Sequence, residues 1–165
     1  MNKQKTRHHR PLDRFDRAIL RILQKNNRIP QREIAEQIHL STAAVQRRIS
    51  ALEADGIIQG NVALVAPEAL RSTISIIVEV HFQNDRSTII EPAKALFQNT
   101  PEVQQCYHVS GNGGFILIML VEDITHYALL SQRLFADNDA VATYRTLVVL
   151  DRIKTGTEIP IPDEP

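Results

Sequence analysis

The sequence has one cysteine, no tryptophan and few aromatic side chains, which make up only 5% of its 165 residues. A single cysteine, Cys106, excludes a disulfide within the chain, and this is typical of proteins from the reducing cytoplasm. No apolar run approaches the roughly 20 residues that a membrane-spanning helix needs. The basic N-terminus has no apolar segment behind it, unlike a secretory signal. The sequence therefore predicts a cytoplasmic protein with an ordinary apolar content.

Motifs for catalysis and metal binding are also missing. The sequence has no phosphate-binding loop, no zinc-ligand spacing and no dinucleotide-binding glycine pattern. Cys106 and His108 share a face of a predicted strand, but such neighbours lie about 7 Å apart, beyond direct hydrogen-bond reach. The adjacent His8 and His9 on a polar terminus make a poor metal site. We therefore expect no catalytic residues, no metal and no enzymatic cofactor.

A net charge of zero conceals an asymmetry between the two parts of the chain. Residues 1–60 contain 12 Lys and Arg against 6 Asp and Glu, whereas residues 61–165 contain 7 against 13. Positive charge attracts a polyanion, and negative charge repels phosphates. The first part is therefore the candidate for nucleic-acid binding, although a solvated charged surface would have the same composition.

Three helices are predicted in the basic part, because apolar residues recur there at helical spacing. Asp13 and Ser41 are good N-cap residues, and Pro30 suits a first helical position. Gly56 suits the left-handed position after a helix end. We expect the first helix to start at Leu12-Asp13 and to end at Asn26-Asn27. The second should run from around Pro30 to near His39-Leu40, and the third from Ser41-Thr42 to Asp55-Gly56. The expected apolar faces are Leu12, Phe15, Ala18, Ile19, Ile22 and Leu23; Ile34, Ala35 and Ile38; and Val45, Ile49 and Leu52.

The second and third helices form the pattern of a helix-turn-helix, because they are short and joined by about four residues. Beyond them, a Gly60-Asn61 turn flanked by apolar residues predicts a small hairpin, or wing, at residues 57–65. The predicted divisions are a basic tail at 1–11, a winged helix-turn-helix domain at 12–60 and a connecting segment at 61–71.

The rest of the chain has the order strand, helix, strand, strand, helix, strand. The predicted segments are Ile74 to Phe82, Asp85 to Gln98, Glu102 to Val109, Phe115 to Val121, Thr125 to Ala136 and Val141 to Ile153. This βαββαβ order predicts an α+β fold, with a ferredoxin-like antiparallel sheet and two helices on one face. We assign it to residues 72–155, followed by a C-terminal tail at 156–165. Strands this apolar need a cover on the second face of the sheet, and dimerisation is the simplest one.

These patterns resemble the Lrp/AsnC, or feast/famine, family of transcription regulators. The similarity is carried by Leu12-Asp-x-x-Asp16, Glu33-Ile-Ala-Glu36, Leu40-Ser-x-x-x-Val45-x-x-Arg48-Ile49 and Leu52-Glu53-x-x-Gly56. Pro101-Glu102-Val103 and the loop from Gly111 to Phe115 are similar to the ligand domain of that family. The resemblance covers roughly residues 12–155. It implies binding to double-stranded DNA, homodimers that assemble further, often to octamers, and an amino-acid effector held between dimers.

The third helix is predicted to read DNA. Its apolar stripe points inward, so its N-terminal end and outer face are left for contacts by Ser41, Thr42, Ala43, Gln46 and Arg47, and we add Arg32 from the second helix. Gln can pair bidentately with adenine, and Arg with guanine or a phosphate. Arg48 matches a recurrent arginine of the family. Two roles stay open for it, a phosphate contact or an internal pair with Asp16.

The loop at residues 110–114 is the candidate effector site. Its three glycines permit close approach of a ligand, and exposed amides there can hold a carboxylate. Glycine content by itself equally fits a flexible turn, and it is the resemblance that favours an effector. The residues that the resemblance implies are Gly111, Asn112, Gly113, Gly114, Phe115, Tyr144 and Thr146. Amino-acid-binding members often carry Asp where this chain has Gly114, so we expect a small apolar effector, leucine or methionine.

Two other functions are compatible with the resemblance. Some similar proteins are tetrapyrrole (sirohaem) decarboxylases, although the basic outer face of the third helix argues against an enzyme. An architectural DNA-binding protein without an effector would share the whole N-terminal part. We favour a sequence-specific regulator that responds to an amino acid.

Overall fold

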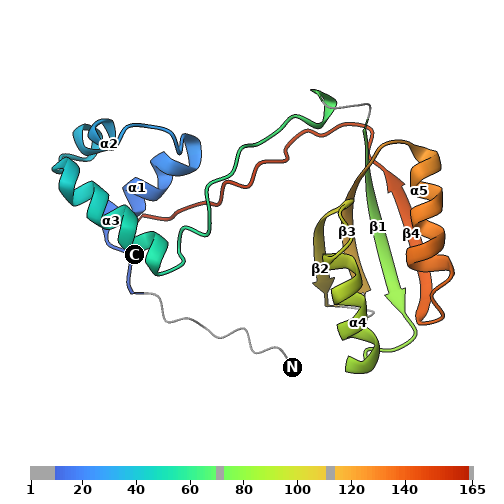
Figure 1. Cartoon of the computed structure of the whole chain (residues 1–165). Helices are drawn as coiled ribbons and strands as arrows, with labels where there is room; N and C mark the ends of the chain where they lie inside the picture. Colours follow the sequence, from blue (N-terminus) through green and yellow to red (C-terminus); the bar gives the residue numbers. More distant parts are fainter. Residues whose placement is uncertain (1–9, 70–72, 111–113, 164–165) are drawn as a thin grey trace. The chain divides into compact units, whose positions relative to one another are not determined.

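The structure is a computed structural model that describes residues 10–69, 73–110 and 114–163. They fall into two units, which we treat separately. The helical unit consists of the residues up to 64 together with those from 154 onward, and the sheet unit consists of residues 65–153. Figure 1 shows that the C-terminal segment, described up to Asp163, returns to the N-terminal helices. Within the described ranges, no helix has the length and apolar character needed to cross a membrane.

The helical unit contains α1 (Arg14–Lys25), α2 (Gln31–Ile38) and α3 (Thr42–Ala54). All three helices contribute to one small core, as their apolar spacing predicts. Its fully buried members are Ile19, Ile34, Ala35, Val45 and Leu52. Half-buried aliphatic side chains, among them Leu23 and Ile49, pack around this core.

The predicted helix ends of this unit are confirmed. The Asp13 carboxylate accepts hydrogen bonds from the amides of Phe15 and Asp16, both at 2.9 Å, and so caps α1. Ser41 caps α3, because its hydroxyl accepts from the Ala44 amide at 3.2 Å. Gly56 follows α3 with φ of 70°, in the left-handed region. One detail differs, since Pro30 precedes α2 as its N-cap and is not its first helical residue.

The predicted hairpin after α3 is wrong. Residues 59–66 have no regular secondary structure, and Val62, Leu64 and Val65 are 76%, 80% and 62% exposed. A two-stranded hairpin this short is marginal in water unless a third strand or a packed face supports it. Val62 and Leu64, which belong to the helical unit, find no such support among its described residues.

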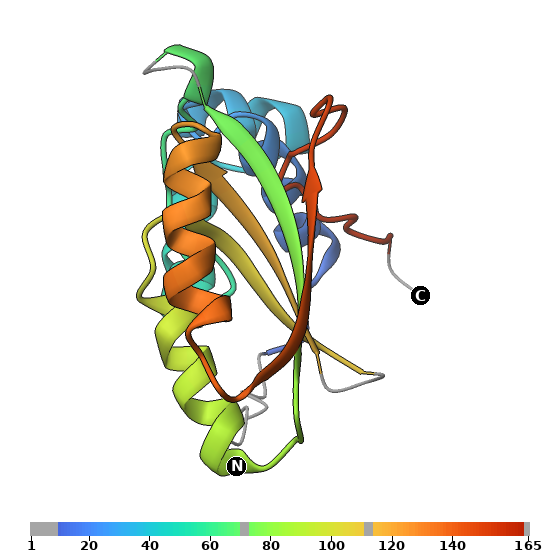
Figure 2. The same cartoon turned by 90° about the vertical axis from the view of Figure 1, so that its right-hand side faces the viewer.

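The sheet unit follows the predicted βαββαβ order. Its elements are a single 3-10 turn, η1 (Pro67–Ala69), then β1 (Ile74–Phe82), α4 (Ser87–Gln98), β2 (Val103–Val109), β3 (Gly114–Val121), α5 (Ile124–Ser131), the π-helical turn η2 (Gln132–Ala136) and β4 (Val141–Val148). The strands are antiparallel in the order β2-β3-β1-β4. Figure 2 shows α4 and α5 on the same side of this sheet. The predicted ferredoxin-like α+β fold is therefore confirmed.

The core of the sheet unit lies between the sheet and these two helices. Alternate residues of β1 and β3 point into it, and it is centred on the rings of Phe82, Phe97, Phe115 and Phe135. Phe97 lies 5.4 Å from Phe115 and 6.2 Å from Phe135, measured between ring centroids. Such tilted and edge-to-face pairs stabilise a core beyond the area that they bury.

The last strand is shorter than predicted. β4 ends at Val148, whereas the apolar pattern continues to Ile153. As an edge strand, β4 pairs only with β1, and the Val149 amide makes the final bond to the Ser75 carbonyl at 2.9 Å. With Ile76 opposite Val148, β1 reaches no further than the position opposite Leu150, because β1 begins at Ile74.

Candidate DNA interface and effector site

The outer face of α3 is exposed as its sequence pattern predicts. Val45 and Leu52 are fully buried, which fixes the rotation of the helix about its axis. The residues predicted to contact DNA from α3 are all exposed except Arg48: Ser41, Thr42, Ala43, Gln46 and Arg47. Arg32 lies on α2, and its Nε donates to Oε1 of Glu36 at 2.9 Å. That pair is largely solvent-exposed, so it costs little to break.

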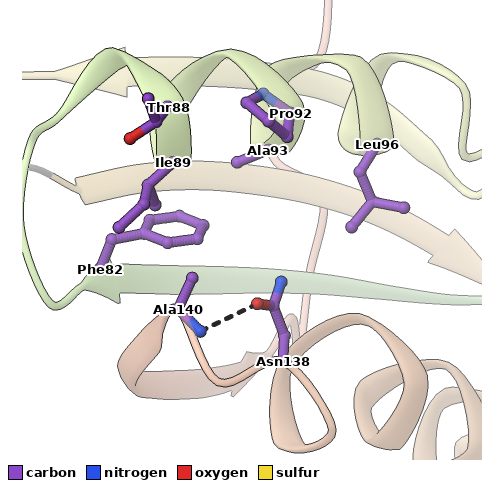
Figure 3. A pocket seen from close by; sticks show the side chains of 8 residues that line it. All are labelled: Phe82, Thr88, Ile89, Pro92, Ala93, Leu96, Asn138 and Ala140. Carbon is purple, nitrogen blue, oxygen red and sulfur yellow. Dashed lines mark hydrogen bonds between the residues drawn. The ribbon is translucent and has the colours of Figure 1, made fainter.

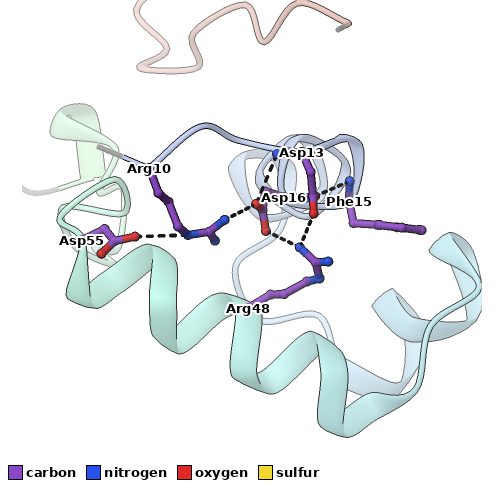
Figure 4. A network of polar contacts seen from close by, with 6 residues as sticks. All are labelled: Arg10, Asp13, Phe15, Asp16, Arg48 and Asp55. Atoms are coloured by element: carbon purple, nitrogen blue, oxygen red, sulfur yellow. Dashed lines mark hydrogen bonds and ion pairs between the residues drawn. The ribbon is translucent and has the colours of Figure 1, made fainter. Parts of the chain in front are cut away.

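Arg48 points the other way, into the helical unit. Its Nη1 lies 2.8 Å from Oδ2 of Asp13 and 2.8 Å from Oδ1 of Asp16. The Asp16 side chain is fully buried, and that of Arg48 is only 24% exposed. Of the two roles that the sequence left open for Arg48, the internal pair is therefore the one that the structure contains (Figure 4).

A second arginine completes this network. Nη1 of Arg10 donates to Oδ2 of Asp16 at 2.7 Å, and its Nε lies 3.2 Å from Oδ2 of Asp55. Arg10 belongs to the segment that the sequence assigns to a basic tail, and no local pattern marks it as a partner of Asp16. The network joins the start of α1, the middle of α3 and the end of α3 (Figure 4).

The charges in this network control the ionisation of the two aspartates. Burial by itself raises the pKa of Asp16, but hydrogen bonds from Arg10 and Arg48 outweigh it, so the pKa lies below its ordinary value. The pKa of Asp13 is lowered in the same way, because the Asp16 amide and Arg48 together outweigh burial. Both carboxylates are therefore charged at neutral pH, and Arg48 is held between two anions.

The effector residues described by the structure lie at one end of the sheet. Gly114 begins β3, and Phe115 is cross-strand from Val80, which in turn is cross-strand from Tyr144 of β4. Adjacent strands are spaced by about 4.8 Å, so Phe115 and Tyr144 are roughly 10 Å apart with β1 between them. Gly111, Asn112 and Gly113 lie outside the described residues.

Most of these side chains already have partners within the chain. Phe115 is 1% exposed in the aromatic core, and its ring stacks on His108 with the ring centroids 4.7 Å apart. The Tyr144 and Phe135 rings pack with their centroids 5.1 Å apart, and the Thr146 hydroxyl is hydrogen-bonded to the Tyr127 hydroxyl. Burial raises the pKa of Tyr127, so this phenol stays protonated. One chain therefore brings Gly114, Phe115, Tyr144 and Thr146 to the same end of the sheet, where the side chains of the last three already have partners within the chain.

Gly114 has a packing reason to be glycine. A β-carbon at this position would lie 3.0 Å from the Val80 carbonyl oxygen and 3.0 Å from Nδ1 of His81. His81 is cross-strand from Gly114, and the alternation of β1 puts it on the face opposite to Val80. A side chain at position 114 would therefore displace His81 or the β1 backbone.

A small apolar cavity of about 170 Å³ lies elsewhere in the sheet unit. It is lined by Phe82, Thr88, Ile89, Pro92, Ala93, Leu96, Asn138 and Ala140. Figure 3 shows the α4 side chains facing the Asn138 turn, where Asn138 accepts a hydrogen bond from the Ala140 amide at 3.1 Å. The described effector candidates, Gly114, Phe115, Tyr144 and Thr146, do not line this cavity, and it is smaller than typical ligand pockets of about 300 Å³ or more. Among the described residues, no group of His, Cys, Asp and Glu could hold a metal ion.

Both units match families of known proteins. Residues 12–59 match a family described as winged helix-turn-helix DNA-binding. Residues 75–159 match the Lrp/AsnC ligand binding domain. The boundary between these matches falls between the two units of the structure.

Curated relatives cover nearly the whole chain. An uncharacterized HTH-type transcriptional regulator of Sinorhizobium fredii is 37% identical over 150 residues, with 91% of this chain and 89% of the relative covered. The leucine-responsive regulatory protein of Escherichia coli is 32% identical over 161 residues, with 98% of each covered. These relatives are named regulators, so the decarboxylase alternative finds no support among them.

Solved structures agree with this assignment. An AsnC family transcriptional regulator from Agrobacterium tumefaciens has a TM-score of 0.83 at 30% identity, with 90% of this chain and 97% of that one covered. A transcriptional regulator from Neisseria meningitidis, solved as a complex with L-Met, has a TM-score of 0.83 at 27% identity, with 91% and 97% covered. The exposed face of α3, the antiparallel sheet and these matches lead to one conclusion: the chain is a DNA-binding transcription regulator with a small-ligand domain, and it belongs to the Lrp/AsnC family.

Proposed function

We propose that this chain is a sequence-specific regulator that inserts α3 into the major groove of its operator. In this proposal Gln46 and Arg47 pair with base edges, and Ala43 leaves room for a thymine methyl group. Ser41 and Thr42, with the free amides of the first turn of α3, bind a backbone phosphate. Arg32 binds a neighbouring phosphate after it leaves Glu36.

The observation that carries this proposal is the contrast between two adjacent arginines. Arg47 is exposed with no acidic partner among the described contacts, whereas Arg48 is held by Asp13 and Asp16. Arg47 is therefore available to DNA, while Arg48 fixes α3 against α1. We assign Arg48 a positioning role and Arg47 a reading role.

The test compares Arg47→Ala with Arg28→Ala, which removes an exposed arginine from the loop before α2. Operator fragments are first selected from genomic DNA with the unmodified protein, and affinities are then measured by fluorescence anisotropy. A bidentate base contact is worth about 1–3 kcal/mol, so Arg47→Ala should weaken binding by roughly 5- to 150-fold without changing the melting temperature. Equal affinities for the two variants would contradict the assignment.

For the effector, we propose leucine or methionine, bound at the hairpin end of the sheet. The proposal draws support from the ligand-binding family match, from the leucine-responsive name of one relative and from the L-Met complex of one structural neighbour. Backbone amides of residues 111–114 would hold the carboxylate of the amino acid, and Tyr144 and Thr146 would line the site from β4. We expect a second dimer to complete this site, because Phe115 already stacks on His108 and the Thr146 hydroxyl is already hydrogen-bonded to Tyr127 within one chain.

Calorimetry with all twenty amino acids tests this proposal. Leucine or methionine should release heat, and Tyr144→Ala should reduce the affinity. Tyr107→Ala, which removes a half-exposed tyrosine from β2, is the matched control. Absence of heat from every amino acid, together with intact DNA binding, would favour an architectural protein without an effector.

We further propose that the protein works in the cytoplasm as a homodimer that assembles to an octamer. The second face of the sheet carries half-buried or exposed aliphatic side chains, namely Ile77, Ile116, Ile118, Leu120 and Leu147. A second copy is the simplest cover for them. Sedimentation velocity should give an octamer, and Ile118→Glu should shift it to smaller species. A monomer at micromolar concentration would contradict the proposal.

A further inference from the structure

The end of the chain is bound to the first helix. We name residues 159–163 the C-terminal strap. The Gln24 side chain pairs with the Ile159 backbone in both directions: the Ile159 amide donates to Oε1 at 2.9 Å, and Nε2 donates to the Ile159 carbonyl at 3.1 Å. Arg21 donates to the Ile161 carbonyl from Nε at 3.2 Å and from Nη2 at 2.9 Å. These contacts join segments that are 135 to 140 residues apart in the sequence.

Both sides of this contact are suited to it. On α1, Arg17, Arg21 and Gln24 share one face, at spacings of four and three residues, separate from the face that buries Ile19. Nη1 of Arg17 adds a bond to the Pro162 carbonyl at 3.2 Å. Donors on the helix thus meet the carbonyl groups of Ile159, Ile161 and Pro162 along the strap.

The strap itself is preorganised for this role. Pro160 and Pro162 restrict the backbone and favour an extended chain whose carbonyls project outward. Prolines also lack amide donors, so the strap presents mainly acceptors to the arginines. Nη2 of Arg21 lies 2.6 Å from Oδ1 of Asp163, but that carboxylate is 94% exposed and contributes little. The hydrogen bonds to carbonyl groups therefore carry most of the contact.

The strap gives the helical unit a second connection to the sheet unit. The chain leaves the helical unit after residue 64 and returns to it at residue 154. An extended chain spans at most about 3.5 Å per residue, so the stretch from Ile58 to Ile74 alone would allow roughly 55 Å between its ends. The stretch from Val148 at the end of β4 to Ile159 allows roughly 38 Å. When the strap is docked, the shorter stretch therefore limits the separation of the two units to less than the longer linker alone would allow.

We propose that the strap, by docking on the Arg17–Arg21–Gln24 face of α1, limits the positions that the DNA-binding helices can take relative to the ligand domain. The occupant of this face is the chain's own C-terminal segment. Releasing it would widen the range of positions of α3 without unfolding either unit. The strap starts only 11 residues after the end of β4, so β4 and α1 are coupled through a short stretch of chain.

Pulsed electron paramagnetic resonance tests this without DNA or effector. Nitroxide labels are attached at Ser50→Cys on α3 and Gln98→Cys on α4, both exposed positions, in a Cys106→Ser background. Excess unlabelled protein is added so that distances within one chain dominate. The double variant Arg21→Ala and Gln24→Ala is compared with a control that changes the exposed Arg28 and Gln37 to Ala.

We expect the distance distribution to become at least twofold wider in the Arg21→Ala and Gln24→Ala variant, and to stay unchanged in the control. A chain that ends at Glu158 should show the same widening, which separates loss of the strap from damage to α1. Unchanged far-UV circular dichroism establishes that the helices remain folded. The same width in the unmodified protein, the double variant and the shortened chain would overturn the proposal.

Discussion

The two units are stabilised by different kinds of interior. Among its described residues, the sheet unit buries fifteen side chains in one cluster, which includes four of the five phenylalanines of the chain. The described part of the helical unit buries five apolar side chains in its core and places a charged aspartate, Asp16, between two arginines. Size and aromatic packing stabilise the first unit, whereas the second depends on a polar network with defined partners.

This difference suits the two tasks. A ligand domain needs a rigid sheet, and a large close-packed core supplies it. A recognition helix must be held in one orientation, and directional hydrogen bonds from Arg48 to two carboxylates fix α3 against α1. All three tyrosines lie in the sheet unit, so tyrosine fluorescence reports on that unit, while ellipticity at 222 nm reports on both.

The largest effect is expected from Phe97→Ala in the sheet unit. Phe97 is fully buried and contacts three other phenylalanine rings, so its removal leaves a large cavity. The free energy of unfolding should fall by about 4 kcal/mol. Urea titration followed by tyrosine fluorescence measures it. Leu129→Ala, which changes a side chain that is 70% exposed, should change stability by less than about 0.5 kcal/mol. Similar losses from both variants would show that the aromatic cluster is not the source of stability.

A somewhat smaller loss is expected from Asp16→Ala in the helical unit. The change leaves Arg10 and Arg48 without their buried partner, and breaking one side of a buried ion pair costs about 3 kcal/mol. Ellipticity at 222 nm should be lost at lower urea, while the tyrosine transition stays in place. Glu36→Ala removes an acid from an exposed pair and serves as the control. Simultaneous loss of both signals would mean that the two units unfold as one.

Acid should weaken the helical unit before it affects the aromatic core. The pKa values of Asp13 and Asp16 are lowered in the folded unit, so their stabilisation is present above the unfolded value of about 3.9. It is lost as the pH falls below that value, through the lower folded pKa values. Thermal melts at pH 7 to 2.5 should show this decline at 222 nm, and Asp16→Asn should flatten it. A decline of the same steepness in Asp16→Asn would assign the pH dependence to other groups.

The smallest effect is expected from Ser41→Ala. The hydroxyl caps α3, and loss of an N-cap costs about 1 kcal/mol. Ser50→Ala, at an exposed interior position of the same helix, should be neutral or slightly stabilising. Melting followed at 222 nm compares the two. If Ser50→Ala is as destabilising as Ser41→Ala, the capping bond is not the cause.

Local patterns in the sequence predict most of the fold. Asp13, Ser41 and Gly56 mark helix ends, because a helix cap depends on hydrogen bonds to residues only three or four positions away in the sequence. The alternating apolar residues Ile74, Ile76, Val78 and Val80 predict the inner face of β1 in the same way. Periodicity also predicts that Gln46 and Arg47 are exposed, so the spacing of apolar residues is sufficient to identify the outer face of α3.

Long-range partners are not visible in this way. Arg48 has Asp13 and Asp16 as partners across 35 and 32 residues, and the sequence leaves its role open. Arg10 looks like part of a basic tail until the fold brings Asp16 and Asp55 beside it. The hairpin prediction at residues 57–65 fails for a related reason, since turn chemistry is local but the support for a short hairpin is not.

The sequence by itself determined the helices, the βαββαβ order of elements along the chain, the resemblance to the family and the face of α3 that is free to meet DNA, because each can be recognised from neighbours along the chain. Only the tertiary structure decided that Arg48 faces inward, that β4 ends where β1 no longer pairs with it, that Gly114 is crowded by His81, and that the C-terminal strap binds α1. Each of these depends on atoms that are distant in sequence and meet only after the chain has folded.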